Sequence, residues 1–166
     1  MGMRPIYRRV RRALGKLRKF ITAEPDQKRL LAEAYLFLAW GRLLKALPFA
    51  RIAPMLGAYM EETTAQPDQQ KEEIIRKISH AVHVMSRYTF WESECLVKAV
   101  AAMCMLHRRQ IDSTIYLGVA RAKRGQLAAH AWLRCGSMII TGGEVMNQYT
   151  VVGYFAKRTI SARRSQ

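Results

Sequence analysis

Residues 91–134 read WESECLVKAVAAMCMLHRRQIDSTIYLGVARAKRGQLAAHAWLR, and this stretch decides the fold. Its first part is apolar on successive turns, which predicts a helix from about 93 to 109 with Cys95 in the first turn. The segment STIYLGV, 113–119, is rich in β-branched and aromatic residues and predicts a strand. A basic, glycine-containing turn separates it from a second predicted strand, 127–134. The stretch therefore predicts a helix followed by a hairpin.

The flanking sequence completes the predicted fold. Towards the C-terminus, residues 138–141 and 150–155 have the composition of two further strands. Towards the N-terminus, apolar residues at helical spacing predict long helices over 25–47 and 69–87, with a short turn or helix at 49–57 between them. We therefore expect an α+β fold, in which N-terminal helices precede a cysteine-bearing helix packed on a small antiparallel sheet.

We divide the chain into four segments. Residues 1–24 form a basic amphipathic segment, 25–87 a helical half, 88–156 the mixed core, and 157–166 a basic tail. The first segment carries an apolar stripe at helical spacing and seven basic residues between 8 and 19. Such a helix either packs on the helical half or lies on an anionic membrane surface.

The charge and the cysteines limit the class of protein. A net charge of +16 and a pI near 10.4 imply attraction to an anionic partner. Three cysteines without paired spacing argue against a disulfide framework and favour a reduced, cytoplasmic setting. No secretory signal and no apolar run of membrane-spanning length is evident. We expect a cytoplasmic protein, held peripherally on the inner membrane face if the first segment binds lipid.

Metal and cofactor binding are not expected. There is no C-x-x-C sequence, and no histidine flanks a cysteine at zinc-like spacing. His80 and His83 are one helical turn apart, which could hold a metal, but no third ligand lies near them in the sequence. We interpret both as surface residues.

Cys95 and His130 have the chemistry of a thiol nucleophile and its base. A helix start presents unpaired backbone N–H groups, which favour a thiolate and can stabilise an oxyanion on an attacked carbonyl. His130 lies in AAHAW, where strand alternation leaves it between two small neighbours. Alone, each residue is more often structural, and we interpret Cys104 and Cys135 that way. The ordered combination of helix-start cysteine, strand and histidine strand favours catalysis.

That combination resembles a known family. The runs WESECLVKA (91–99), MLHRRQIDSTIYLGV (105–119) and AHAW (129–132) resemble the leader peptidase of lasso-peptide gene clusters, as does the helical half with its ALPFAR (46–51). The resemblance covers about residues 25–155. It implies a transglutaminase-like, papain-related core over 88–156.

The resemblance also implies a Cys-His-Asp triad, with the acid on the strand after the histidine strand. The corresponding stretch, MIITGG at 138–143, holds no carboxylate. Glu144 lies just beyond it and is the candidate we name for orienting His130. Thr141 or Asn147 could instead orient the imidazole through a neutral hydrogen bond, as the Asn of papain-like sites does.

The activity that the resemblance implies is removal of the leader from a ribosomally made precursor peptide. Because the helical half shows no leader-binding domain, the leader would be presented by a separate small leader-binding protein. An ATP-dependent cyclase would then close the freed core peptide.

Two other functions stay open from the residues alone. The same thioester could be captured by an amine, as in transglutaminases. A basic nucleic-acid-binding protein is disfavoured, because the charge is spread along the chain and no nucleic-acid motif occurs. We expect no nucleic-acid partner.

Overall fold

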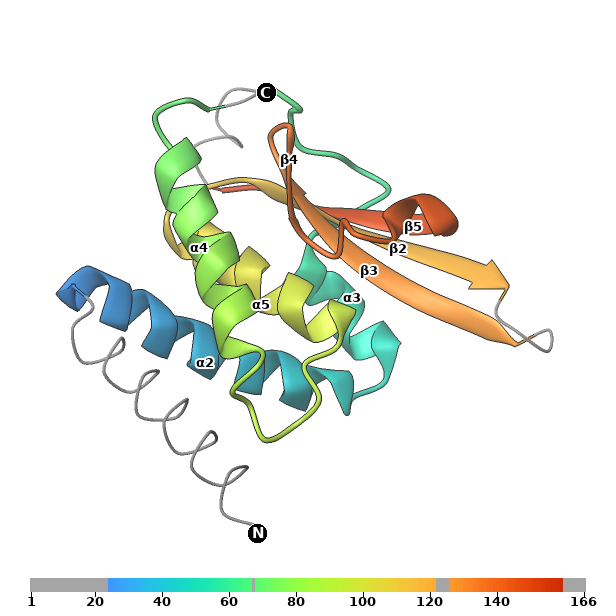
Figure 1. Cartoon of the computed structure of the whole chain (residues 1–166). Coiled ribbons are helices and arrows are strands. Elements are labelled where there is room, and N and C mark those ends of the chain that lie inside the picture. The colour runs from blue at the N-terminus through green and yellow to red at the C-terminus, as the bar shows by residue number, and fades with distance from the viewer. Residues whose placement is uncertain (1–23, 67, 122–125, 160–166) are drawn as a thin grey trace, which may run out of the picture.

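The structure is a computed structural model, and it describes residues 24–66, 68–121 and 126–159. In these residues, helices pack on one side of a five-stranded antiparallel sheet (Figure 1). This confirms the expected α+β class. Residues 1–23 and 160–166 lie outside the described residues. The basic amphipathic helix expected in the first segment and most of the basic tail are therefore not described.

Four helices lie in the described part of the chain: α2 (Pro25–Lys45), α3 (Phe49–Leu56), α4 (Glu72–Met85) and α5 (Cys95–Arg108). Each matches a predicted helix with ends shifted by a few residues. Pro48 and Gly57 bound α3, as proline and glycine do at helix ends. No helix among the described residues is both long enough and apolar enough to cross a bilayer.

The sheet contains β1 (Ala58–Tyr59), β2 (Ser113–Arg121), β3 (Leu127–Cys135), β4 (Met138–Thr141) and β5 (Thr150–Lys157), in the order β1-β5-β2-β3-β4. The last four confirm predicted strands. The expectation of helices alone before residue 88 was wrong, because β1 pairs with β5 through Ala58 and Ala156. Two residues are too few to show a periodicity, so the sequence gives no sign of β1.

The hydrophobic core lies between the sheet and α5. Leu133 and Ile115 are fully buried against α5, which is covered in turn by α2 and α4. Because side chains alternate along a strand, Ala131 and Leu133 face this core. His130 and Trp132 belong to the opposite face of β3.

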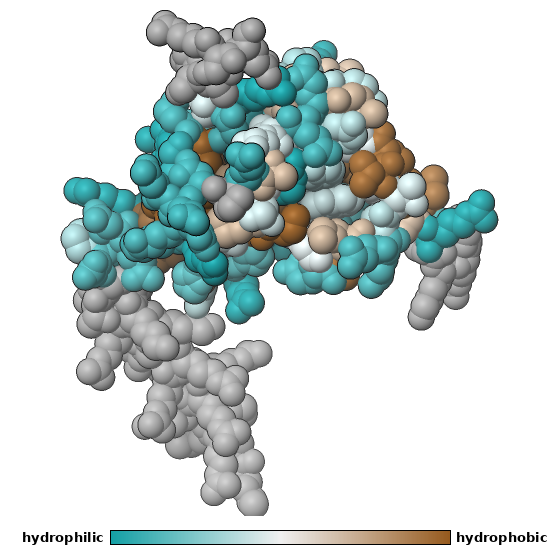
Figure 2. Space-filling model, turned by 90° about the horizontal axis from the view of Figure 1, so that it is seen from above, coloured by the Kyte–Doolittle hydropathy of each residue, from teal (hydrophilic) through white to brown (hydrophobic). Residues whose placement is uncertain are grey.

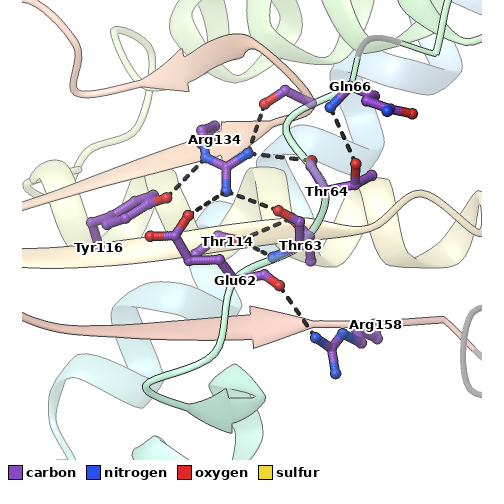
Figure 3. A network of polar contacts seen from close by, with 9 residues as sticks. Glu62, Thr63, Thr64, Gln66, Thr114, Tyr116, Arg134 and Arg158 are labelled. Atoms are coloured by element: carbon purple, nitrogen blue, oxygen red, sulfur yellow. Dashed lines mark hydrogen bonds and ion pairs between the residues drawn. The ribbon is translucent and has the colours of Figure 1, made fainter. Parts of the chain in front are cut away.

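On the face of the sheet opposite α5, Arg134 is the shared donor of a network of hydrogen bonds (Figure 3). Its guanidinium donates hydrogen bonds to the Tyr116 hydroxyl at 2.8 Å, the Glu62 carboxylate at 3.0 Å, and the carbonyls of Thr63 at 3.0 Å and Gly136 at 2.8 Å. The side chain is only 12% exposed. One guanidinium therefore fastens the segment after β1 to the centre of the sheet.

Candidate active site

Cys95 is the first residue of α5, and its side chain is half-buried. The residue before it, Glu94, is the N-cap and makes no side-chain capping bond. Ser93, where we expected the helix to begin, lies outside it, and its hydroxyl is 2.8 Å from that of Thr89. Backbone N–H groups of the first helical turn have no partner within their own helix. Because Cys95 is the first residue of α5, its thiol lies beside these N–H groups.

Two contacts fix the start of α5 on α2. Glu94 forms an ion pair with Lys45 at the end of α2. Gly41 lies so close to α5 that a β carbon on it would be 3.0 Å from the Val97 carbonyl oxygen. The position of Cys95 therefore depends on a glycine and a lysine of another helix.

His130 is half-buried on β3 between two aromatic rings. Its ring centroid lies 4.8 Å from that of Tyr149 and 5.9 Å from that of Trp132. Its Nε2 atom is 2.8 Å from the carbonyl oxygen of Gly142. Since a carbonyl can only accept, Nε2 carries the proton of the neutral ring, and Nδ1 is left as the basic nitrogen.

Gly142 has a conformation that few other residues adopt. Its φ is +74°, and a β carbon there would lie 2.5 Å from the Ala131 carbonyl oxygen and 3.2 Å from His130 Nε2. It follows β4 directly, in the stretch where the resemblance implies an acid. Our sequence reasoning missed Gly142, although the Gly-Gly pair after a predicted strand marks a special turn.

Within the described residues, none of the three side chains considered as the third catalytic residue is hydrogen-bonded to His130. Glu144 is 72% exposed, and its Oε1 atom lies 3.8 Å from Nε2 of His83. Thr141 is 1% exposed, and its hydroxyl has no partner among the described residues. Asn147 is exposed in the short 3-10 helix η2 (Met146–Gln148). In this structure the partner of His130 Nε2 is a backbone carbonyl and not Glu144.

The structure places Cys95 and His130 on two elements that pack together, α5 and β3. It does not join them by a hydrogen bond. Within the described residues, neither the Cys95 thiol nor His130 Nδ1 has a hydrogen-bond partner. Strand alternation also turns His130 away from the face that carries α5. Proton transfer between them therefore requires the two side chains to approach each other.

The other two cysteines have environments that suppress thiolate formation. Burial raises the pKa of the Cys104 thiol. Burial also raises the pKa of Cys135 to about 11. A raised pKa lowers the fraction of reactive thiolate at both positions. Their structural role stays a prediction.

The end of the sheet that carries His130 is apolar at its surface. Leu127, Val151 and Val152 are all exposed. Seen from above, the molecule is largely hydrophilic, and hydrophobic residues gather towards the β2–β3 hairpin (Figure 2). Val151, Gly118 and His130 occupy paired positions on three adjacent strands. An apolar peptide segment could contact this end of the sheet.

The fold thus places a helix that begins at Cys95 against an antiparallel sheet that carries His130 on its second long strand. The chain belongs to the transglutaminase-like superfamily, which it matches over residues 35–153. No curated protein and no solved structure matches it. Membership supports an enzyme of the cysteine protease or acyltransferase type. Within the described residues no three His, Cys, Asp or Glu side chains cluster as metal ligands would.

Proposed function

We propose that the protein is a cysteine peptidase that removes the leader from a lasso-peptide precursor, with Cys95 as nucleophile and His130 as base. The observation that carries the catalytic assignment is the hydrogen bond from His130 Nε2 to Gly142. It holds the ring in the tautomer whose Nδ1 can take a thiol proton. Cys95 is the cysteine at a helix start, whereas burial raises the thiol pKa of Cys104 and of Cys135.

The reaction follows from these groups. His130 Nδ1 accepts the proton of Cys95, and the thiolate attacks the scissile carbonyl carbon. The backbone N–H groups at the start of α5 stabilise the oxyanion. Collapse breaks the C–N bond, and the imidazolium gives its proton to the departing amine. Water, deprotonated by His130, then hydrolyses the thioester and releases the leader acid.

Gly142 takes the part that a carboxylate has in a triad. Its carbonyl orients the imidazole through Nε2 without a full negative charge, comparable to the neutral Asn of papain-like sites. Cys95 and His130 are not hydrogen-bonded, and strand alternation turns His130 away from α5. The proposal therefore requires that β3 or the start of α5 rearranges when substrate binds.

The substrate and the partners rest on the sequence resemblance. The leader would be presented by a separate small leader-binding protein, and an ATP-dependent cyclase would close the freed core peptide. The net charge of +16 favours an acidic leader or an acidic face on that small protein. These steps would take place in the cytoplasm.

Transfer of the acyl group to an amine is the second candidate function, and superfamily membership favours it equally. It uses the same thioester, captured by an amine instead of water. Mass spectrometry separates the two reactions. Hydrolysis adds the mass of water across the cut products, whereas transfer yields a new amide.

The test is precursor cleavage by purified variants, with the leader-binding protein present. Cys95→Ala and His130→Ala should each lower the rate by roughly 10³-fold or more. Cys104→Ala is the matched control and should remain active, because it removes a thiol from the same helix outside the site. Cleavage at the wild-type rate by Cys95→Ala would exclude the proposed nucleophile.

A further inference from the structure

Helix α2 is apolar on two sides, and only one side is covered in the described structure. Its inner face is buried against the rest of the fold by Leu30, Leu31, Ala34, Leu38, Gly41 and Leu44. Its outer face carries Leu36, Trp40 and Leu43, which are 68%, 44% and 65% exposed, and Leu47, 43% exposed, follows in the turn just after the helix. Spacings of four and three residues place the first three side chains in one row. The four residues are here called the outer stripe. A row of large exposed apolar side chains on one face indicates a surface that another body covers.

Positive charge borders the outer stripe. Arg42 is exposed beside Leu43, and Arg51 is exposed just beyond the end of α2. Arg108 is 67% exposed and lies over the ring of Phe37, also on α2. Glu33, the carboxylate within this part of α2, is 16% exposed and forms ion pairs with Arg109 and with Arg108 itself, so the positive charge beside the stripe rests chiefly on Arg42 and Arg51. The stripe is thus an apolar surface with a cationic margin.

A second apolar side chain lies beside the same helix. Phe90, in the connection between α4 and α5, is 90% exposed. Its ring packs edge-on against Trp91 at 4.5 Å, and Trp91 contacts Tyr35 of α2 at 5.3 Å. The connection is held at its other end by the ion pair of Glu94 with the end of α2, and it lies beside α2 in Figure 1.

We propose that the outer stripe, together with Phe90, is the surface by which the protein binds an anionic lipid bilayer. Leucines and a tryptophan enter the boundary between headgroups and acyl chains, and neighbouring arginines attract lipid phosphates. A second copy of the chain fits less well, because a shared stripe would bring Arg42, Arg51 and Arg108 of two strongly cationic chains together. The proposal does not depend on the peptidase activity.

The test compares full-length wild-type protein with the double variant Leu36→Gln/Leu43→Gln by co-sedimentation with vesicles. Wild type should bind vesicles of phosphatidylcholine with phosphatidylglycerol, and bind poorly to phosphatidylcholine alone. Loss of two leucines from the bilayer should weaken binding at least about tenfold. Both sites are well exposed, so thermal unfolding should hardly change. Leu127→Gln, 74% exposed on β3, is the matched control and should bind as wild type does.

Other results overturn the proposal. Equal sedimentation of the double variant and wild type would mean that other residues hold the lipid. Equal binding to anionic and to neutral vesicles would show that the arginines do not contribute to lipid binding through charge. A wild-type dimer that ignores vesicles and dissociates in the double variant would make the stripe a self-interface. A blue shift of tryptophan fluorescence on vesicles that has the same size in Trp40→Phe as in wild type would show that Trp40 does not enter the bilayer, which contradicts the proposal.

Discussion

Gly142→Ala tests whether a backbone carbonyl orients His130. A non-glycine residue in the left-handed region costs about 1–2 kcal/mol, and Gly142 has a φ of +74°. The new β carbon would lie 2.5 Å from the Ala131 carbonyl oxygen, so the turn must shift. That shift removes the hydrogen bond to Nε2, which contributes about 1 kcal/mol. We expect the free energy of unfolding to fall by about 2–3 kcal/mol.

Gly142→Ala should also lower kcat/KM by more than the loss of folded protein accounts for. An imidazole displaced by about 1 Å can lower the rate about 10²-fold. Gly136→Ala is the matched control, because Gly136 also has a positive φ, +55°, in the turn between β3 and β4. It introduces similar backbone strain without touching His130. We expect it to lose about 1–2 kcal/mol of stability and to keep kcat/KM per folded molecule.

Denaturant unfolding gives the two stabilities, and precursor cleavage gives kcat/KM under conditions where both variants are folded. Nitrogen chemical shifts of His130 report the tautomer directly, without substrate. We expect a protonated Nε2 in wild type and in Gly136→Ala, and a mixture of tautomers in Gly142→Ala. If kcat/KM of the two variants agrees within about threefold, under about 1 kcal/mol in the barrier, the Gly142 carbonyl does not orient the base.

Three further predictions concern the fold and the thiols. Arg134→Lys should lower the free energy of unfolding by about 2–3 kcal/mol, measured by denaturant titration, because a lysine cannot replace the forked donors of a largely buried guanidinium. Iodoacetamide should alkylate Cys95 first in peptide mapping. With a pKa of about 11, only about one Cys135 in a thousand is a thiolate near pH 8, and burial also raises the pKa of Cys104. The hydrogen bond from Lys45 lowers the pKa of Glu94 below the ordinary value of a glutamate. The pair therefore stabilises the fold above that ordinary pKa, and this stabilisation is lost as the pH falls through the lowered pKa of Glu94. Glu94→Gln should therefore cost under about 1 kcal/mol near neutral pH, and its unfolding curve should merge with that of wild type in acid.

Local patterns in the sequence were sufficient for most of the fold. Helical spacing and β-branched runs predicted α2 to α5 and the four longer strands, because these elements are long enough to show a period. The two-residue β1 shows none, and its pairing with Ala156 is a tertiary contact. The start of α5 was misplaced because Ser93 bonds to Thr89 rather than to the helix.

The candidate site was predictable only where it consists of side chains with distinctive chemistry. Cys95 and His130 stand out by residue type and order, and their catalytic roles remain proposals. The bond from Nε2 to the Gly142 carbonyl could not be found that way, since every residue has a carbonyl and only the turn geometry directs this one. Glu144 was chosen for its charge and nearness in sequence, whereas the fold places it against His83.

The pairing of β1 with β5 bears on how the protein is made. Ala58 leaves the ribosome long before Ala156, yet the two are partners in one sheet. Until β5 is synthesised, β2 lacks its hydrogen-bonded neighbour on that side and its edge stays unpaired. The five-stranded sheet therefore cannot be completed while the helical half is being synthesised, because β1 and β2 both pair with β5. A nascent chain stalled before Thr150 would expose an unpaired strand edge, which makes it a substrate for chaperones.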